Sequence, residues 1–291
     1  MTIRDRIAAA PISWGVCEVP GWGHQMGVRR VLTEMAAAGI VATELGPDGF
    51  LPQEPRDKAA VLDAHGLRAV GGFVPVVLHD PMGDVMDTVR PALDDLVAAK
   101  AGTIVLSADS GVSGYDTRTA LDRDGWKTLF TNLDRIRDEA GQRGIIATLH
   151  PHVGTLVERP DEVDKVLLGS QIPLCLDTGH LLIGGTDPAE LAARVPDRIA
   201  HTHLKDVDAG LAARVRSGEL TYSAAVRAGM YRPLGSGDVD ITAIVSGLEA
   251  HGYDGWYVME QDTILDAEPP AGEGPSNDVR ASLAFLVEVT A

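Results

Sequence analysis

Residues 173–206 read PLCLDTGHLLIGGTDPAELAARVPDRIAHTHLKD, and this stretch decides the fold. Two short apolar runs in it end in side chains that can bind a metal: Asp177 and His180 after the first, His201 and His203 after the second. Residues two apart in a strand share a face, so His201 and His203 point the same way. If the two runs are neighbouring parallel strands, Asp177 and His203 lie at the same end of a sheet, as in a barrel site.

The same alternation of an apolar run with an amphipathic segment extends over all 291 residues. The predicted strands are Ile7–Ile12, Ile40–Glu44, Arg68–Phe73, Thr103–Ser107, Ile145–His150, Leu174–Asp177, Ile199–His203 and Trp256–Glu260. The predicted helices are Gly27–Ala38, Gln53–Ala64, Asp84–Ala101, Asp124–Arg143, Pro160–Leu168, Pro188–Val195, Ile241–His251 and Asn277–Val289. Glycines predicted to end helices are Gly39, Gly66, Gly102, Gly144 and Gly252. Eight strand–helix repeats without a polar linker predict one α/β domain over residues 1–291, a (β/α)8 TIM barrel.

The composition and net charge of the chain argue against several classes of binding partner. The net charge of −17 argues against the nucleic-acid backbone and against an anionic membrane surface. The sequence shows no signal peptide and no apolar run long enough for a membrane helix, and two cysteines do not indicate a disulfide framework. We therefore expect a cytoplasmic protein that acts on a small molecule, with no nucleic acid or membrane partner, as a homo-oligomer.

The strand ends suggest a metal site. His150, Asp177, His203 and Glu260 stand at the ends of the predicted fifth to eighth strands. Barrel interiors otherwise favour branched apolar side chains, so four successive polar strand ends indicate convergence on one ion. Two imidazoles and two carboxylates suit a divalent metal, with Mn²⁺ or Co²⁺ expected first and Zn²⁺, Fe²⁺ or Mg²⁺ as alternatives.

Further residues are candidates for acid–base chemistry. His180 is either an orienting or acid–base group or simply lies exposed at a helix start. His152 follows His150 across a proline and could bind substrate or metal, or do neither. Lys205 could stabilise an enolate or act as acid or base, or be a surface lysine. Glu260 is a candidate for acid–base work as well as for metal binding.

Other residues are candidates for binding substrate. Glu44 could recognise hydroxyl groups or cap the next helix. Trp14 and Trp22 could form a pocket wall for a sugar-like ring, or pack in the core. A long loop after His203 should contain a short helix at 222–228, and loops of this length often act as lids. Its segment PLGSGDVD offers backbone amides for a polar ligand. Arg232, directly before that segment, is a candidate substrate-binding residue.

A family resemblance rests on motifs spread along nearly the whole chain. They are PISWG (11–15), TELG (43–46), HPHVGT (150–155), LDTGH (176–180), HTHLKD (201–206), GMYRPLGSGDVD (229–240) and GWYVMEQD (255–262). The chain resembles the xylose-isomerase-like TIM barrels, and HPHVGT and the 229–240 segment resemble the inosose dehydratase branch. In the family's sugar epimerases the strand ends carry Glu, Asp, His and Glu as metal ligands. Asp177, His203 and Glu260 match the last three, and His180 matches a substrate-contacting histidine.

The first ligand departs from the epimerase pattern, because His150 stands where those enzymes have a glutamate. Whether His150 or His152 is the ligand stays open. Losing one of two acid–base glutamates counts against a two-base epimerase and fits the dehydratase branch. The resemblance thus implies metal-assisted dehydration of a cyclic polyhydroxy ketone through an enolate, with His180, His152, Glu260 and Lys205 as candidate bases.

Three alternatives remain at this point. The nearest is a keto-sugar or inosose isomerase or epimerase that uses enediolate chemistry. DNA repair is a second, since apurinic endonucleases share the barrel, although the charge of −17 disfavours it. The third is a metal-containing subunit of a larger enzyme.

Overall fold

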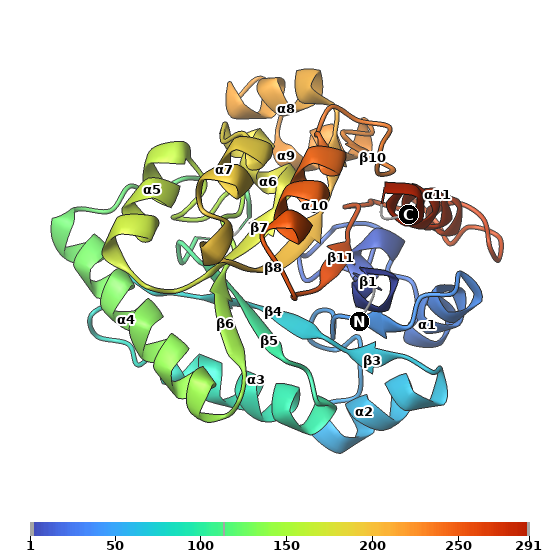
Figure 1. Ribbon diagram of the computed structural model, residues 1–291, viewed down its shortest axis with the longest axis horizontal. Helices are drawn as coiled ribbons and strands as arrows, with labels where there is room; N and C mark the ends of the chain where they lie inside the picture. The colour runs from blue at the N-terminus through green and yellow to red at the C-terminus, as the bar shows by residue number, and fades with distance from the viewer. Residues whose placement is uncertain (1–2, 113, 290–291) are drawn as a thin grey trace.

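The computed structural model describes residues 3–112 and 114–289 (Figure 1). One parallel sheet holds nine strands in the order β3-β2-β1-β11-β8-β7-β6-β5-β4. Their bounds are β1 Ile7–Ala9, β2 Ala42–Thr43, β3 Arg68–Ala69, β4 Gly71–Val76, β5 Thr103–Ala108, β6 Ile146–Leu149, β7 Leu174–Asp177, β8 Ile199–Leu204 and β11 Tyr257–Met259. Eight of the nine strands begin within two residues of the start of a predicted strand, and the ninth, β4, begins inside the predicted strand Arg68–Phe73.

The sheet closes through Val70, which joins the two end strands β3 and β4. Its amide donates to the Thr43 oxygen at 3.0 Å, and its carbonyl accepts from the Gly102 amide at 3.2 Å. The segment Arg68–Val76 therefore pairs with β2 on one side and β5 on the other, as a single barrel strand. The predicted eight-stranded TIM barrel is confirmed.

Helices pack around the outside of the barrel (Figure 1). They are α1 Val28–Ala37, α2 Pro55–Ala64, α3 Met86–Ala99, α4 Arg123–Gln142, α5 Pro160–Gly169, α6 Thr178–Gly184, α7 Pro188–Arg194, α10 Ile241–Ala250 and α11 Pro275–Val289. Aspartate side chains begin several of them: Asp187 accepts from two amides at the start of α7, and Asp240 from the Ala243 amide in α10. Such caps satisfy amides that have no partner within the helix.

The connection from β8 to α10 is more structured than predicted. It contains β9 Asp206–Val207, α8 Ala209–Arg216, α9 Tyr222–Arg227 and β10 Tyr231–Arg232, and β9 pairs antiparallel with β10. We name residues 206–240 the insertion. The short helix was predicted, but α8 and the strand pair were not.

Asp206 fastens the end of the insertion to the barrel. Its carboxylate accepts from the amides of Gly235 and Gly237 at 2.9 Å each, and from Val239 at 3.0 Å. The expectation that amides of PLGSGDVD cover a polar ligand is therefore wrong for these three, because the protein's own carboxylate takes them. A Cβ at Gly237 would lie 2.3 Å from Asp206 Oδ1, so only glycine permits this approach.

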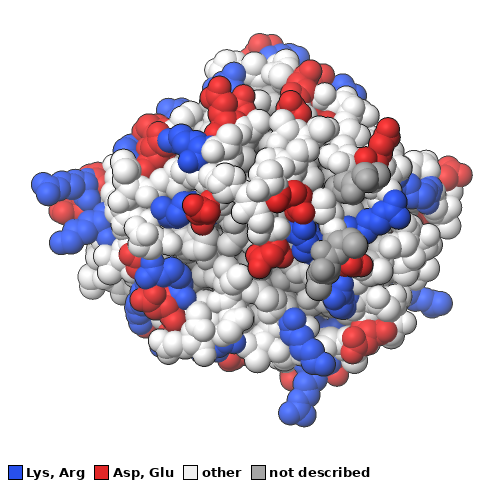
Figure 2. Space-filling model, viewed as in Figure 1, with Lys and Arg blue, Asp and Glu red and all other residues white. Residues whose placement is uncertain are grey.

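Charges of both signs are mixed on the face of the molecule shown in Figure 2. Among the described helices, none combines the length and the apolar character that crossing a bilayer would require.

Candidate active site

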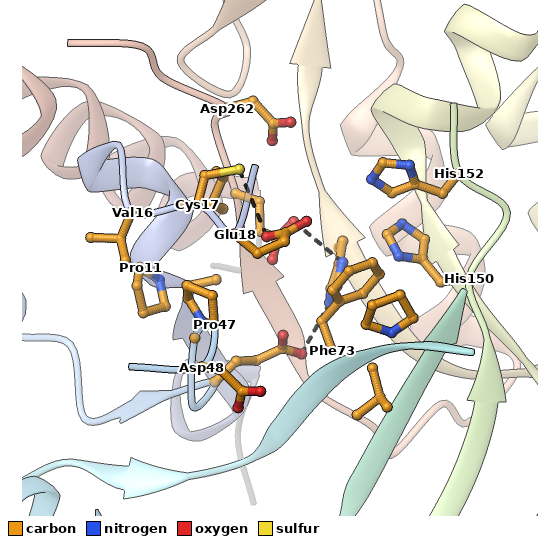
Figure 3. A pocket seen from close by; sticks show the side chains of 18 of the residues that line it. Pro11, Val16, Cys17, Glu18, Pro47, Asp48, Phe73, His150, His152 and Asp262 are labelled. Atoms are coloured by element: carbon orange, nitrogen blue, oxygen red, sulfur yellow. Dashed lines mark hydrogen bonds and ion pairs between the residues drawn. The ribbon is translucent and has the colours of Figure 1, made fainter. Parts of the chain in front are cut away.

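The strand ends of the barrel surround a cavity of about 370 Å³. Among its lining residues are His150, His152, His203, Lys205 and Glu260, from the second half of the chain. Figure 3 shows His150 and His152 on one side of the cavity, with Phe73 beside His150. The predicted working face is thus the face at which the strands end.

His150, Asp177 and His203 meet in the manner expected from the strand pairing. Asp177 at the end of β7 is the register partner of His203 in β8. His150 Nε2 lies 3.1 Å from Asp177 Oδ2, and His203 Nδ1 lies 3.6 Å from the same oxygen. The fourth predicted ligand, Glu260, directly follows β11, and its Oε2 lies 3.3 Å from His203 Nδ1.

The facing atoms of the first three residues fit a cation. His150 Nε2, Asp177 Oδ2 and His203 Nδ1 are buried and make no hydrogen bond within the described residues. Burying such atoms without a partner is costly. Two ligands about 2.1 Å from an ion at right angles stand about 3.0 Å apart, close to the observed spacing. Both His150 and His152 follow β6, the predicted fifth strand. His150 joins this group and His152 does not.

Electrostatics favours the ligand forms of two of these residues. Burial lowers the pKa of His150 to about 4, so its ring is neutral at neutral pH. Burial alone would raise the pKa of Asp177, but Lys205 and His180 hold it well below its usual value. A neutral imidazole and an ionised carboxylate are the forms that bind metals.

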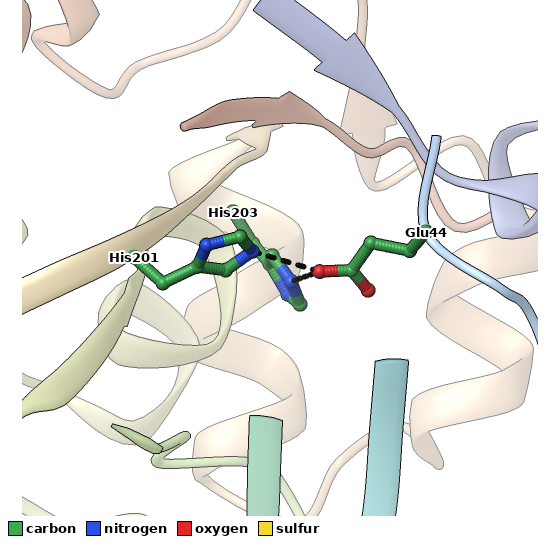
Figure 4. A group of neighbouring side chains, drawn as sticks. All are labelled: Glu44, His201 and His203. Atoms are coloured by element: carbon green, nitrogen blue, oxygen red, sulfur yellow. Dashed lines mark hydrogen bonds and ion pairs between the residues drawn. The ribbon is translucent and has the colours of Figure 1, made fainter. Parts of the chain in front are cut away.

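Glu44 forms hydrogen bonds with two histidines of β8, His201 and His203 (Figure 4). Its Oε1 accepts from His201 Nε2 at 2.8 Å and from His203 Nε2 at 3.0 Å. A carboxylate on one ring nitrogen orients a histidine ring, and here the other nitrogen, His203 Nδ1, faces Asp177 and Glu260. The capping role considered for Glu44 is wrong, because Glu54 precedes α2 at the cap position.

We expect Glu44→Gln to weaken metal affinity about 10- to 100-fold, because the neutral amide holds His203 less firmly and makes Nδ1 less basic. Competition with a fluorescent chelator measures the dissociation constant. Glu34→Gln is the matched control, since Glu34 is also buried but pairs with Trp14 and Ser276. Equal affinity of both variants would contradict this role of Glu44.

Lys205 is buried among acidic groups. Its Nζ lies 3.0 Å from Glu260 Oε2 and 3.7 Å from Asp177 Oδ2, and it forms an ion pair with Asp262. Burial alone would lower the pKa of Lys205, but Asp262 and Glu260 raise it well above its usual value. The side chain is therefore a charged ammonium in the cavity wall, not a surface lysine.

Sequence reasoning missed the partners of Lys205. Asp262 Oδ2 accepts from Tyr222 at 2.5 Å, and the hydroxyls of Tyr222 and Tyr231 lie 2.7 Å apart. Asp262 stands two residues after Glu260, a spacing that could have indicated it. Tyr222 and Tyr231 belong to the insertion; Tyr231 stands in the 229–240 motif, but neither tyrosine was named as a candidate.

The rings of His152 and His180 stack on each other with centroids 3.7 Å apart. The Nδ1 atom of His152 donates to the Val153 carbonyl at 2.7 Å, which leaves Nε2 as its acceptor. Burial, followed by the charge of His150, lowers the pKa of His152 to about 3. His180 is buried behind the cavity lining, with Nε2 3.4 Å from Lys205 Nζ.

We expect the metal-free protein to lose stability as the pH falls from about 6.5 to 5. The pKa values of His150 and His152 in the folded protein, about 4 and about 3, lie below the usual histidine value of 6.5, so the unfolded chain binds more protons in this range. Each contributes a loss of up to about 1.4 kcal/mol per pH unit, and Glu260, whose pKa burial raises to about 7, offsets part of it. Urea unfolding at each pH measures it. His251→Asn, at an exposed site, should leave the slope unchanged, and a flat profile would contradict the neutral histidines.

Two predicted substrate-binding residues lie away from the cavity. Trp14 is fully buried, and its Nε1 donates to Glu34 at 2.9 Å, so it packs in the core. Arg232 is exposed and pairs with Asp208 at 3.3 Å, outside the barrel mouth. Trp22 does line the cavity, as does Glu44.

Comparison with known proteins gives the family. The chain is 32% identical over 270 residues to an inosose dehydratase from Geobacillus kaustophilus, covering 88% of this chain and 87% of that protein. Its fold matches the IolI protein with a bound zinc atom (TM-score 0.72, 14% identity, 98% of each chain). It also matches L-ribulose 3-epimerase (TM-score 0.71, 16% identity, 100% of this chain and 95% of that one). The model of the xylose isomerase-like TIM barrels matches residues 32–288, and the chain belongs to that family.

Proposed function

We propose that this protein is a metal-dependent lyase that removes water from a cyclic polyhydroxy ketone of the inosose type through an enolate. The observation that carries the proposal is the meeting of unpartnered His150 Nε2, Asp177 Oδ2 and His203 Nδ1 in the cavity wall. The 32% identity to an inosose dehydratase supports the reaction and the substrate class.

We propose His150, Asp177, His203 and Glu260 as the ligands of a divalent ion. Such an ion supplies Lewis-acid polarisation of a ketone oxygen, which favours loss of a proton from the adjacent carbon. Mn²⁺ and Co²⁺ remain our first candidates for this nitrogen and carboxylate set, with Zn²⁺, Fe²⁺ and Mg²⁺ as alternatives. Glu44 holds the ring of His203 in place.

His152 and Lys205 are our choices for the proton transfers. His152 lines the cavity, stays neutral and keeps Nε2 free, so it can accept the α-proton. Lys205 also lines the cavity and is protonated, so it can stabilise negative charge on the substrate and donate a proton to the departing hydroxyl. His180 keeps the ring of His152 in place by stacking.

The test is turnover of inosose by chelator-stripped protein and by protein reloaded with each metal, run in D₂O. Water loss restored by one metal supports the lyase. Deuterium in a stereochemically altered product of unchanged formula would instead support an epimerase, for which the same base and acid would serve. Equal dehydration with and without metal would contradict the proposal.

We expect His152→Gln to lower kcat about 100- to 10,000-fold while the metal content stays the same, because the variant lacks the base but keeps the four ligands. Stopped-flow turnover and elemental analysis measure the two quantities. His65→Gln is the control, because His65 follows the last residue of α2 and its ring bonds the Val61 carbonyl. A parallel loss of metal would mean that His152 is a ligand.

A further inference from the structure

The ammonium of Lys205 has three N–H donors and three polar partners within hydrogen-bond distance. Its Nζ donates to Asp262 Oδ1, the nearest of them, and lies 3.0 Å from Glu260 Oε2 and 3.4 Å from His180 Nε2. Glu260 is a proposed metal ligand, whereas Asp262 forms an ion pair with Lys205 alone among the described residues. Asp262 is therefore the carboxylate that can hold Lys205 while Glu260 is engaged as a ligand.

Asp262 is itself held by two tyrosines. Its Oδ2, the oxygen that does not contact Lys205, accepts from the Tyr222 hydroxyl at 2.5 Å. An ionised carboxylate can only accept, so Tyr222 donates its single proton to Asp262 and must accept from the Tyr231 hydroxyl at 2.7 Å. The hydrogen bonds thus run from Tyr231 through Tyr222 to one oxygen of Asp262, and from Lys205 to the other. Rotation of the carboxylate would break both of its bonds.

Both tyrosines are fixed within the insertion. The Tyr222 amide donates to Asp116 Oδ1 at 2.8 Å at the start of α9, and Tyr231 lies in β10, which pairs with β9. Tyr231 also packs against the aliphatic part of Lys205. A Cβ added to Gly179 would lie 2.8 Å from the Lys205 Cβ and 3.0 Å from Tyr231 Cε1, so these groups meet over Gly179 with no room for a side chain.

The tyrosines do not face the space in which a substrate would bind. The lining of the cavity of about 370 Å³ includes Lys205 and Asp262 and, among the residues that the structure describes, neither Tyr222 nor Tyr231. All four side chains are buried. A buried polar network whose members all have partners is rigid. The tyrosines can therefore affect a bound substrate through the position of Asp262 and Lys205.

We propose, on the basis of the proposed function, that Asp262 is a positioning residue for Lys205 and is held in place by Tyr222 and Tyr231. The network keeps the ammonium where it can protonate the departing hydroxyl. In that step the enolate electrons form the new C=C bond, the C–O bond breaks, and the oxygen leaves as water with a proton from Lys205, which solvent later restores. The insertion is therefore a working part of the active site.

The test removes one hydroxyl group from the network. Tyr222→Phe keeps the ring but lacks the hydrogen bond to Asp262. In the full-length, metal-loaded protein, kcat for water loss from inosose should fall about tenfold, with KM and metal content unchanged. In D₂O the ratio of deuterium uptake into recovered inosose to water loss should rise about tenfold. The reason is that His152 still removes the α-proton, while the enolate returns to the ketone more often than it loses its hydroxyl.

Tyr253→Phe is the matched control, because the Tyr253 hydroxyl donates to the Trp256 carbonyl at 2.9 Å and has no contact with this network. Its kcat and its ratio should equal those of the unaltered protein. Tyr231→Phe leaves the bond from Tyr222 to Asp262 in place and should give a smaller rise in the ratio than Tyr222→Phe. An unchanged ratio in Tyr222→Phe, or an equal rise in Tyr253→Phe, would overturn the inference and leave the proposed function intact.

A second measurement does not need turnover. In protein loaded with Zn²⁺, a diamagnetic ion, the Lys205 ammonium is observed by its ¹⁵N–¹H NMR signal, which Lys205→Arg identifies by its loss. We expect this signal to shift or broaden in Tyr222→Phe and to stay the same in Tyr253→Phe. An unaltered signal in Tyr222→Phe would overturn the inference. Failure of the unaltered protein to dehydrate inosose would by contrast count against the proposed function, and the NMR result would still decide whether the tyrosines position Lys205.

Discussion

Asp177→Asn should abolish metal-dependent turnover while the barrel still folds. The amide keeps an oxygen that can accept from the His180 amide, as Oδ1 does at 2.7 Å, so the start of α6 is preserved. The negative charge between His150, His203 and Lys205 is lost. We expect metal affinity to fall more than about 100-fold and kcat/KM about 1,000-fold, which corresponds to about 4 kcal/mol of transition-state stabilisation.

The measurements are metal content after dialysis and the rate of water loss. Asp187→Asn is a close control, because Asp187 also caps a helix but lies exposed at the start of α7. Both variants remove one carboxylate from a cap, so only the position differs. Full activity of Asp177→Asn would rule out the metal site.

Lys205→Met should have the largest effect on stability. The methionine side chain fills the space, but Asp177, Glu260 and Asp262 lose the cation that faces all of them. Removing one partner of a buried ion pair costs about 3 to 5 kcal/mol. We expect the free energy of unfolding of the metal-free protein to fall by about this amount, and kcat of the loaded protein to fall at least 100-fold.

Urea unfolding of the metal-free protein measures the stability loss. Lys165→Met is its control, because Lys165 forms an exposed pair with Asp161 that is worth less than about 1 kcal/mol. Lys205→Arg separates charge from geometry, since the planar guanidinium retains the charge but not the compact ammonium. We expect it to recover much of the stability and little of the activity. A stable, fully active Lys205→Met would contradict both roles.

The sequence predicts the gathering of the strand-end side chains because the physical rule is simple. Parallel strands end at one edge of a sheet, so polar residues at successive strand ends come together whatever connects them. His150, Asp177, His203 and Glu260 met for this reason. The choice between His150 and His152 was open in the sequence, since it depends on how the chain turns after Pro151.

The remaining parts of the site depend on contacts between residues far apart in the sequence, which no local sequence pattern predicts. Glu44 directly follows β2 and its side chain bonds His203 of β8, a pairing of residues 159 positions apart. Tyr222 reaches Asp262 only because the insertion folds over the strand ends. Helix ends show the same limit: Gly144 and Gly252 have φ values of 73° and 81°, as predicted, but after α3 the left-handed residue is Lys100, with φ 58°, and not Gly102.

The hydrogen bonds of Asp206 couple the insertion to the end of β8. Asp206 directly follows Lys205, whose main chain exchanges hydrogen bonds with Thr178 Oγ1 at 2.6 and 2.8 Å. The end of the insertion is thus bonded to the residue that directly follows Lys205, so a displacement of the insertion would also strain the strand end that positions the Lys205 ammonium beside Glu260 and Asp262. On its other side the insertion contacts the first half of the chain, because the ring of Tyr222 lies 5.5 Å from that of Tyr115, whose hydroxyl donates to Glu18 at 2.6 Å.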